Sequence, residues 1–557
     1  MTLEQATEHL LANEPAFALK MVEIRGELLP AFANTPQTLR EHFQHGASAR
    51  KHDDYIVYAG TRLTYDDYVD QANRISHLLT NRFGVQKGDK VAIAMRNLPE
   101  FCTLFAGIVN IGAVAVLING WWTSEELEYG FTDSGVKLAF ADGRRAERIQ
   151  PFAERRGINL VQVHDAGETL SALLAETPAS DWPAVDIQPQ DDYGILYSSG
   201  STGHPKGVVL THQGAISSIY SWVFAAAALT LMYPDAPDPR PSSYLCGTPL
   251  FHVTASHAVF LLSVAAGAKL VLMGKWDGED ALRLINREEV TRFIGVPTMS
   301  ADIREASLRT GIGAPTLEML ASGGAKRPGS QVAEQAAAFP GANVATGWGL
   351  TETNAMGIGM MGEEYLDRPE MCGRLYPPLQ QIAIMDDDAR PLPVGEVGEI
   401  AIKASTLMRG YLNKPEATAE AIRNGWFLTG DLGRIDDEGY VQIVDRKKNI
   451  IIRGGENISC LEVEGALHRH PAVAEAVAFS APDDRMGEVV AAAIWFRESV
   501  APADLIASLD TRLATFKHPV RLWSLDAPLP RGATDKIDRR AIQEACLSGR
   551  LGEEKLL

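Results

Sequence analysis

A phosphate-binding loop is indicated between Tyr197 and Gly207, where the sequence reads Y-S-S-G-S-T-G-H-P-K-G. Gly200 and Gly203 allow a positive φ, which turns backbone N–H groups toward one point, and such a concavity suits an anion. Lys206 supplies a mobile point charge of the kind that binds phosphate. Four hydroxyl side chains add short hydrogen-bond donors: Ser198, Ser199, Ser201 and Thr202.

This loop is not a Walker A loop, because that pattern would need Gly in place of Pro205 and Ser or Thr in place of Gly207. Residues 195–197 and 208–210 are apolar and are expected to form the strands that enter and leave the loop. A plain Gly/Ser turn in a hairpin is the alternative to phosphate binding.

A second group of residues suited to nucleotide chemistry reads G-W-G-L-T-E, from Gly347 to Glu352. The flanking glycines leave Trp348 accessible, and an aromatic plate can stack on a nucleobase. Glu352 offers an oxygen ligand suited to Mg²⁺ beside phosphates. The alternative is a buried tryptophan next to an acidic residue at a helix N-terminus.

Two further residues stand out at the ends of apolar or proline-rich stretches. Asp431 follows the apolar residues 426–428, and an aspartate there can accept hydrogen bonds from the hydroxyls of a ribose. A turn-capping aspartate is the alternative. Lys536 lies on a Gly/Thr loop after a proline-rich turn, which is the usual setting of a surface lysine. It is a candidate functional residue only because of its spacing from the other motifs.

The elements that must position these residues alternate along the chain. Short apolar runs are separated by amphipathic stretches from about residue 55 onward, which predicts βαβ units and an α/β fold with mostly parallel sheets. At 557 residues the chain is expected to hold several units. The clearest apolar runs are residues 91–94, 113–118, 137–141 and 270–273.

The pattern predicts an N-terminal domain over residues 1–444, beginning with a helical extension at 1–45. From about 372 to 444 the strands are closely spaced, which predicts a small antiparallel barrel or meander. The charged residues 445–449 are expected to be an exposed joint. The remaining residues, 450–557, are expected to form a compact α+β module with a helix at 459–469 and a strand at 491–496.

Composition excludes several classes of function. A net charge of −19 argues against a nucleic-acid or anionic-membrane surface. The uncharged stretch 101–123 is long enough to span a bilayer, but it divides into a helix, a turn at Gly112 and a strand, so a soluble fold is expected. Residues 1–19 lack the features of a secretory signal. Five scattered cysteines without C-x-x-C indicate neither zinc nor disulfides and fit a reducing cytoplasm.

Taken together and in order, these motifs resemble the adenylate-forming superfamily of acyl-CoA synthetases, carrier-protein adenylation domains and beetle luciferases. The resemblance covers about residues 50–545. It implies a large N-terminal domain of two αβ subdomains plus a small β-barrel, followed by a mobile C-terminal domain.

The resemblance implies roles for individual residues around ATP. The loop from Ser198 to Lys206, with Thr202 as a catalytic residue, would wrap the β- and γ-phosphates. Trp348 stands where a tyrosine commonly stacks on adenine, and Glu352 matches the magnesium ligand. Asp431 matches the ribose clamp. Further positions implied to bind ATP or AMP are Gly323, Gly324, Ala325, Gly347, Gly349, Thr351 and Arg446; Lys326 replaces the usual proline after Ala325.

The resemblance also implies a site that is rebuilt between two half-reactions. Lys448 falls at the hinge position, and Lys536 matches the lysine that bridges the carboxylate and the α-phosphate, with Asp535 before it in place of the common glycine. The loop Arg453-Gly454-Gly455 is expected on the thiol side. His252 matches a residue at the mouth of the acyl pocket. The expected pocket residues are Trp222, His252, Thr254, Ser256, Asn354, Ala355 and Met356.

The function implied is an ATP-dependent carboxylic acid–CoA ligase that uses ATP, Mg²⁺ and coenzyme A and forms an acyl-adenylate before the thioester. A stand-alone enzyme that loads a carrier protein, and a non-catalytic nucleotide-binding regulator, are the alternatives. Expected partners are a medium-chain fatty, aryl or polycyclic acid, ATP and CoA, with no nucleic acid. The expected location is the cytoplasm, and the sequence is compatible with a homodimer. Serine-hydrolase and zinc-protease motifs are absent from the sequence.

Overall fold

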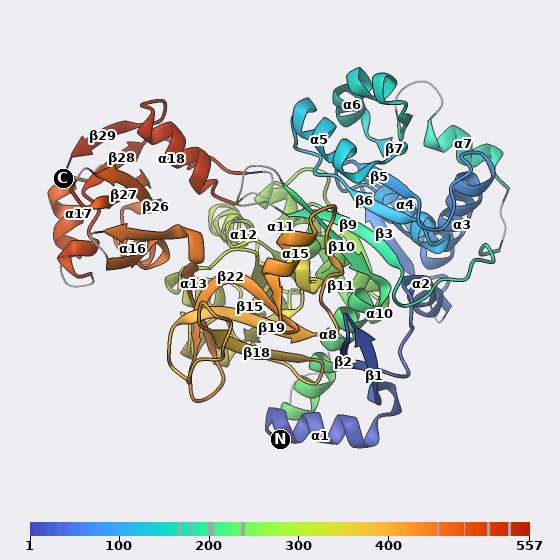
Figure 1. The fold of residues 1–557 in the computed structure, drawn as a ribbon, viewed down its shortest axis with the longest axis horizontal. Helices are drawn as coiled ribbons and strands as arrows, with labels where there is room; N and C mark the ends of the chain where they lie inside the picture. Colours follow the sequence, from blue (N-terminus) through green and yellow to red (C-terminus); the bar gives the residue numbers. More distant parts are fainter. Residues whose placement is uncertain are drawn as a thin grey trace.

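The computed structural model describes residues 1–48, 50–164, 169–178, 181–198, 205–234, 240–453, 456–483, 485–498, 500–509, 513–532 and 536–556. The fold is mixed α/β, with two large sheets and a small antiparallel sheet in the N-terminal part and a separate C-terminal part (Figure 1). The predicted fold class is therefore confirmed.

The first large sheet has seven strands and carries the predicted phosphate loop. Its central strands are parallel, while β10 runs antiparallel to both β9 and β20. In sheet order the strands are β20 (Gly410–Tyr411), β10 (Lys206–Thr211), β9 (Asp192–Ser198), β6 (Val114–Leu117), β5 (Lys90–Ala94), β7 (Leu138–Ala141) and β8 (Asn159–Gln162). The helices of this region are α3 (Tyr65–Asn81), α4 (Pro99–Asn110), α5 (Ser124–Ser134), α6 (Gly143–Arg156) and α7 (Leu170–Glu176).

The second large sheet has nine strands, and its parallel centre places the G-W-G-L-T-E segment. β14 and β15 end at Gly323 and Gly349, and ligands of open α/β sheets bind outside such carboxyl ends. In sheet order the strands are β17 (Arg374–Leu375), β16 (Gly357–Met361), β15 (Asn343–Gly349), β14 (Met319–Gly323), β13 (Arg292–Gly295), β11 (Ser243–Cys246), β12 (Lys269–Leu272), β3 (Asp54–Tyr58) and β4 (Thr61–Thr64). Helices α11 (Gly278–Arg287), α12 (Pro297–Thr310), α13 (Ser330–Ala338) and α14 (Glu363–Asp367) belong to this region.

The small sheet is antiparallel throughout, as the closely spaced strands predict. Its strands are β18 (Gln380–Met385), β19 (Gly398–Ala404), β21 (Ile422–Arg423), β22 (Trp426–Ile435) and β23 (Val441–Arg446). Helix α15 (Pro415–Ala421) precedes β21. The joint expected at 445–449 begins inside a strand, because β23 continues to Arg446, where it pairs with Asp431 on β22.

The C-terminal part lies at the upper left of Figure 1 and has hydrophobic cores of its own. Two clusters of buried residues fill it, and all their members come from residues 451–551. Its sheet contains β24 (Ile450–Arg453), β25 (Glu456–Ser459), β26 (Val473–Asp483), β27 (Gly487–Phe496), β28 (Arg521–Leu525) and β29 (Glu553–Leu556). Its helices are α16 (Cys460–Leu467), α17 (Pro502–Leu509) and α18 (Arg539–Leu547).

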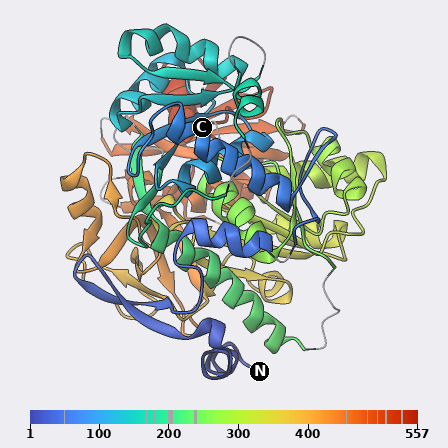
Figure 2. The ribbon, with the colours of Figure 1, turned by 90° about the vertical axis from the view of Figure 1, so that its right-hand side faces the viewer.

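The N-terminal segment corrects one expectation. Residues 1–45 are helical only at α1 (Leu3–Asn13), in a short 3₁₀ turn and in α2 (Leu39–Ser48), since β1 (Leu19–Ile24) and β2 (Glu27–Phe32) form an antiparallel hairpin between the two helices. Helix α1 packs on α8 (His212–Met232), as Figures 1 and 2 show. The hairpin turn falls at Arg25 and Gly26, both with positive φ.

Two apolar segments are long enough to raise the question of a membrane. Residues 101–123 divide as predicted, into α4, a turn at Gly112 with a φ of +68°, and β6. In the described part of the chain, α8 alone has the length and composition to cross a bilayer, and more than half of its most apolar stretch is buried inside the protein. It is a core helix that packs against α1 and α10 (Leu262–Ala266).

Candidate functional site

The predicted phosphate loop connects two paired strands. β9 ends at Ser198 and β10 begins at Lys206, and these two residues face each other in the antiparallel ladder. The flanking strand predictions are therefore confirmed, and the element is a hairpin. The residues between the strands that are expected to contact phosphate lie outside the described residues: Ser199, Gly200, Ser201, Thr202 and Gly203.

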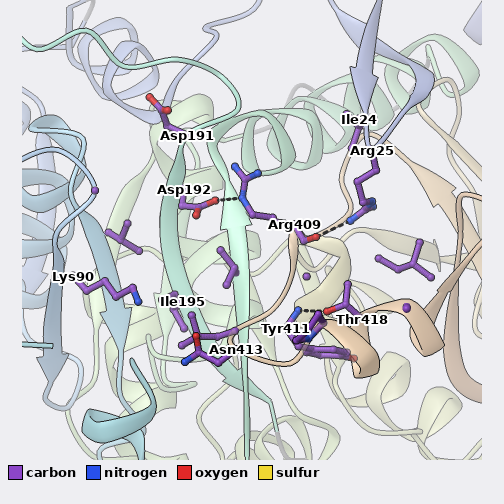
Figure 3. Close-up of a pocket in the computed structure, with 18 of the residues that line it drawn as sticks. Ile24, Arg25, Lys90, Asp191, Asp192, Ile195, Arg409, Tyr411, Asn413 and Thr418 are labelled. Atoms are coloured by element: carbon purple, nitrogen blue, oxygen red, sulfur yellow. Dashed lines mark hydrogen bonds and ion pairs between the residues drawn. The ribbon is translucent and has the colours of Figure 1, made fainter. Parts of the chain in front are cut away.

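Lys206 and Glu352 meet at Tyr411, a residue to which the sequence assigned no role. The Lys206 Nζ lies 4.8 Å from the centroid of the Tyr411 ring, and the Tyr411 hydroxyl donates a 2.9 Å hydrogen bond to Glu352 Oε1. Tyr411 sits on β20, at the wall of the cavity drawn in Figure 3, and β20 pairs with β10 and so brings the three residues together. No local signal could reveal this contact, because Tyr411 is 59 residues from Glu352.

Glu352 is suited to hold a cation beside phosphates. Its side chain is buried, and burial raises the pKa of its carboxyl, while the Tyr411 hydrogen bond and the charges of Arg446 and Lys206 oppose that rise. Among the described residues no group of three His, Cys, Asp or Glu side chains could hold a metal ion alone. That fits Mg²⁺, which is usually bound through one or two carboxylates plus the phosphates of the substrate.

Trp348, Asp431 and Arg446 form a hydrogen-bonded row. The Trp348 Nε1 donates a 2.8 Å hydrogen bond to Asp431 Oδ2, and the Arg446 Nε lies 2.5 Å from Asp431 Oδ1. Asp431 is only 2% exposed. Burial raises the pKa of its carboxyl, and Arg446 and Trp348 oppose that rise. An ionised carboxylate has about four acceptor sites, so two remain for the hydroxyls of a ribose.

Lys536 reaches this site from the C-terminal part. A Cβ built on Gly324, whose φ is +76°, would lie 3.0 Å from the Lys536 Nζ. Burial, followed by the charge of Arg446, lowers the pKa of Lys536 to about 8, and Asp431 opposes that fall. Gly324 and the Lys536 ammonium group therefore lie next to each other. Asp535 lies outside the described residues.

His252 lies near the same ammonium group. It occupies the N-cap position of the short helix α9 (Val253–Ala255), and its Nε2 is buried with no hydrogen-bond partner among the described residues. Burial and then the charge of Lys536 lower the pKa of His252 to about 3. The ring is therefore neutral at physiological pH, and a bound group could satisfy its Nε2.

The residues expected to line an acyl pocket lie on three separate segments of the chain. Trp222 is half-buried on α8, while Thr254 and Ser256 follow His252. Ala355 and Met356 follow the turn that bears Glu352, and Ala355 has a φ of +65°. This arrangement leaves the assignment to an acyl pocket a prediction.

Asn354 belongs to a buried polar network that the sequence did not reveal. Its Oδ1 accepts hydrogen bonds of 3.1 Å from the Tyr193 hydroxyl and from His257 Nε2, and its Nδ2 donates to the Thr406 carbonyl at 2.7 Å. Burial lowers the pKa of His257 to about 4. Because Asn354 is fully buried with both ends of its amide bonded, it ties the turn after Glu352 to β9 and the neighbouring π-helical segment (Ser256–Leu261).

The hinge and thiol-side positions are only partly described. Lys448 lies in a 3₁₀ turn, Lys447–Asn449, directly after β23. Arg453 ends β24 and donates a hydrogen bond to the Phe516 carbonyl. Gly454 and Gly455 lie outside the described residues.

Known proteins share this architecture over nearly the whole chain. Residues 43–412 match the model of the AMP-binding enzyme family, and residues 462–536 match the AMP-binding enzyme C-terminal domain. The chain is 34% identical over 484 residues to the long-chain-fatty-acid–CoA ligase FadD13 of Mycobacterium tuberculosis, covering 87% of this chain and 93% of that protein. It is 30% identical to 4-coumarate–CoA ligase 3 of Oryza sativa subsp. japonica, covering 88% of each.

A solved structure extends the comparison to bound nucleotide. The o-succinylbenzoate coenzyme A synthetase MenE from Bacillus subtilis, in complex with ATP and a magnesium ion, aligns with a TM-score of 0.77 at 28% identity. The alignment covers 90% of this chain and 99% of that one.

Proposed function

The chain belongs to the family of AMP-binding enzymes, and we propose how its residues carry out the reaction of an AMP-forming acid–CoA ligase. The enzyme is an acid–thiol ligase of the CoA-ligase type. The observation that supports the proposed site most directly is the position of Lys536, whose Nζ lies beside Gly324. Arg446 and Asp431 shift the pKa of Lys536 in opposite directions, and Lys536 lowers the pKa of His252.

In the first half-reaction a carboxylate oxygen of the acid attacks the α-phosphorus of ATP, and the bond to the β-phosphate oxygen breaks to release pyrophosphate. Negative charge on the phosphate oxygens must be offset as this happens. Lys536 would supply an ammonium group to the carboxylate and the α-phosphate. Asp431 would hold the ribose, and Trp348 would stack on adenine. Mg²⁺, when bound at Glu352, would offset charge on the phosphates.

In the second half-reaction the CoA thiolate attacks the acyl carbonyl, and the bond to AMP breaks to give the thioester. Lys536 occupies the space beside Gly324, so the thiol needs the C-terminal part to move away. Rotation about Lys448 would accomplish this and bring the Arg453-Gly454-Gly455 loop to the thiol side. His252 would act as a gate to the acyl pocket, since its neutral ring has a buried and unpartnered Nε2 within the described part of the chain.

The acid is a carboxylate with an apolar body, of the medium-chain fatty, aryl or polycyclic kind. This class fits pocket residues that are mostly small or medium in size, and the relatives named for long-chain-fatty-acid and 4-coumarate substrates have acids of both kinds. Asn354 would shape the pocket through its backbone rather than its amide. A cytoplasmic location and a homodimer remain predictions.

A panel of fatty, aryl and polycyclic acids tests the proposal. Carboxylate-dependent AMP release with free CoA is the expected result. AMP release with a carrier protein in place of CoA, and not with CoA, would instead indicate an enzyme that loads a carrier protein. Acid-dependent exchange of pyrophosphate into ATP tests adenylation alone. An enzyme that binds ATP but shows no exchange with any acid would favour the non-catalytic regulator.

A further inference from the structure

A buried carboxylate joins the small sheet to the C-terminal part. Asp445 lies on β23, directly before Arg446, and its side chain is fully buried. Its Oδ2 accepts a 2.8 Å hydrogen bond from the Ser459 hydroxyl and a 3.0 Å hydrogen bond from the Leu461 N–H. Its Oδ1 accepts from the Arg446 N–H at 2.7 Å. One oxygen of Asp445 therefore bonds its own strand, and the other bonds a segment that follows the proposed hinge.

The partners of Asp445 stand at the first turn of α16. Ser459 is the N-cap residue of this helix, and its hydroxyl oxygen also accepts from the Glu462 N–H at 3.1 Å. The first N–H groups of a helix have no partner within it, and the helix dipole favours an anion at that end. Asp445 thus adds a second cap to α16, supplied by a different part of the protein.

This cap spans the proposed hinge. The buried side chains of α16, such as that of Val463, belong to a hydrophobic cluster shared with β26, β27 and β28 in the C-terminal part (Figure 1). Asp445 instead belongs to the small sheet, where it pairs with Leu432 on β22. Lys448 stands between Asp445 and α16 in the sequence. A rotation about Lys448 must therefore change the distance between the carboxylate and the helix.

A short series of contacts leads from α16 to Lys536. Glu464 on α16 forms a 2.7 Å ion pair with Arg539, the first residue of α18. Burial acts to lower the pKa of Arg539, but negative charges that include those of Glu464 and Asp445 raise it overall. Lys536 lies just before α18 in the sequence, and its Nζ lies beside Gly324. The orientation of α16 is thus tied to the position of the lysine.

We propose that Asp445 is a positioning residue for adenylation, which holds the C-terminal part in the orientation that places Lys536 in the site. This role rests on the proposed function, in which Lys536 serves the first half-reaction and leaves for the second. Rotation about Lys448 carries α16 away from β23, so both hydrogen bonds to the Asp445 Oδ2 break. Because these bonds exist only before the rotation, they favour the adenylating orientation over the thioester-forming one.

Comparison of the two half-reactions in Asp445 variants tests this role. Asp445→Ala removes both hydrogen bonds across the hinge, so acid-dependent pyrophosphate exchange should fall about tenfold, the loss expected for charge-assisted hydrogen bonds. Thioester formation from CoA and supplied acyl-adenylate should keep the parent rate or become faster. Asp445→Asn retains an acceptor for the Leu461 N–H and should lose less of the exchange activity.

Asp277→Ala is the matched control. The Asp277 Oδ1 caps α11 by accepting from the Glu279 and Asp280 N–H groups, both at 3.0 Å. Asp277 and α11 belong to the same part of the protein, so no cap across the hinge is lost. The ratio of the two half-reaction rates should therefore remain that of the parent, and an equal change of this ratio in Asp277→Ala and Asp445→Ala would overturn the proposal.

The orientation can also be measured without turnover. Spin labels on Leu308→Cys and Ser548→Cys, two exposed positions in the N- and C-terminal parts, report the distance between the parts by double electron–electron resonance. The five native cysteines are buried. With ATP bound and no acid present, the labelled parent should show one main distance, and Asp445→Ala should populate a second.

Two results would overturn the role of Asp445. One is equal loss of both half-reactions in Asp445→Ala, which would indicate a purely structural contribution. The other is a distance distribution that Asp445→Ala leaves unchanged. A parent enzyme that catalyses neither half-reaction would overturn the proposed function instead, and the label distances would still decide whether Asp445 sets the orientation of the C-terminal part.

Discussion

Replacing Trp348 with Phe tests how the chain holds the ribose clamp. Phe retains an aromatic face for adenine but removes the indole N–H that donates to Asp431 Oδ2 at 2.8 Å. Asp431 is buried and would keep only Arg446 as a charged partner. A hydrogen bond to a charged group contributes about 1.5–3 kcal/mol. Since about 1.4 kcal/mol equals a factor of ten, kcat/KM for ATP should fall at least about tenfold.

The same substitution should change the pH dependence in a defined direction. Trp348 helps to oppose the rise in the pKa of Asp431 that burial causes. Without the N–H the pKa rises further, so Asp431 becomes protonated at a higher pH and stops accepting both ribose hydroxyls. The acid limb of kcat/KM for ATP should therefore move to higher pH. Discrimination between ATP and 2′-deoxy-ATP should also decrease.

A matched control is available in the same chain. The Trp276 Nε1 donates to Asp302 Oδ2, also at 2.8 Å, away from the site. Trp276→Phe removes an equivalent bond and should leave the KM for ATP and the acid limb unchanged. The reasoning is refuted if Trp348→Phe retains the parent pH profile and ATP affinity, or if Trp276→Phe changes both equally.

Three further predictions concern the lysine, its neighbouring glycine and the buried network. Because the pKa of Lys536 is lowered to about 8, acid-dependent pyrophosphate exchange should decline above that pH as the ammonium loses its proton. Lys536→Arg should be slower but should lack this decline, and an unchanged alkaline limb in the variant would contradict the assignment. Gly324→Ala should slow pyrophosphate exchange about tenfold, because the new side chain is strained at positive φ and displaces Lys536. Gly311, with a φ of +73°, has open space around it, so Gly311→Ala should keep the parent rate. Equal exchange rates in the two variants would disprove the contact between Gly324 and Lys536. Asn354→Leu removes the acceptor that Tyr193 and His257 share and the donor to the Thr406 carbonyl, although Tyr193 and His257 still contact each other at 2.6 Å. The free energy of unfolding should therefore fall by about 2 kcal/mol, and an unchanged denaturation midpoint would show that the Asn354 amide contributes nothing.

The sequence predicted local features of this protein well. The strands around the phosphate loop and the helix–turn–strand division at Gly112 follow from periodicity and glycine conformation, which act over a few residues. The N-terminal hairpin was missed because its turn reads Arg-Gly instead of the usual Asn-Gly or Asp-Gly signal. Because β1 buries none of its side chains fully, its sequence also lacks a clear core face.

Contacts between distant segments could not be predicted from residue patterns. Trp348 and Asp431 are 83 residues apart, and their hydrogen bond depends on how two different sheets pack. The resemblance to a family supplied the joint role of these residues, but not the bond between them. Likewise the sequence assigned no role to His257, and only the fold reveals that Tyr193 and Asn354 satisfy its ring.

The central claim, that Lys536 acts on the α-phosphate only during adenylation, is tested most directly by measuring the two half-reactions of Lys536→Ala. Acid-dependent exchange of pyrophosphate into ATP should be lost. Thioester formation from CoA and supplied acyl-adenylate should proceed at close to the parent rate, because Lys536 leaves the site in that step. Equal loss of both half-reactions, or retention of the exchange, would contradict the account.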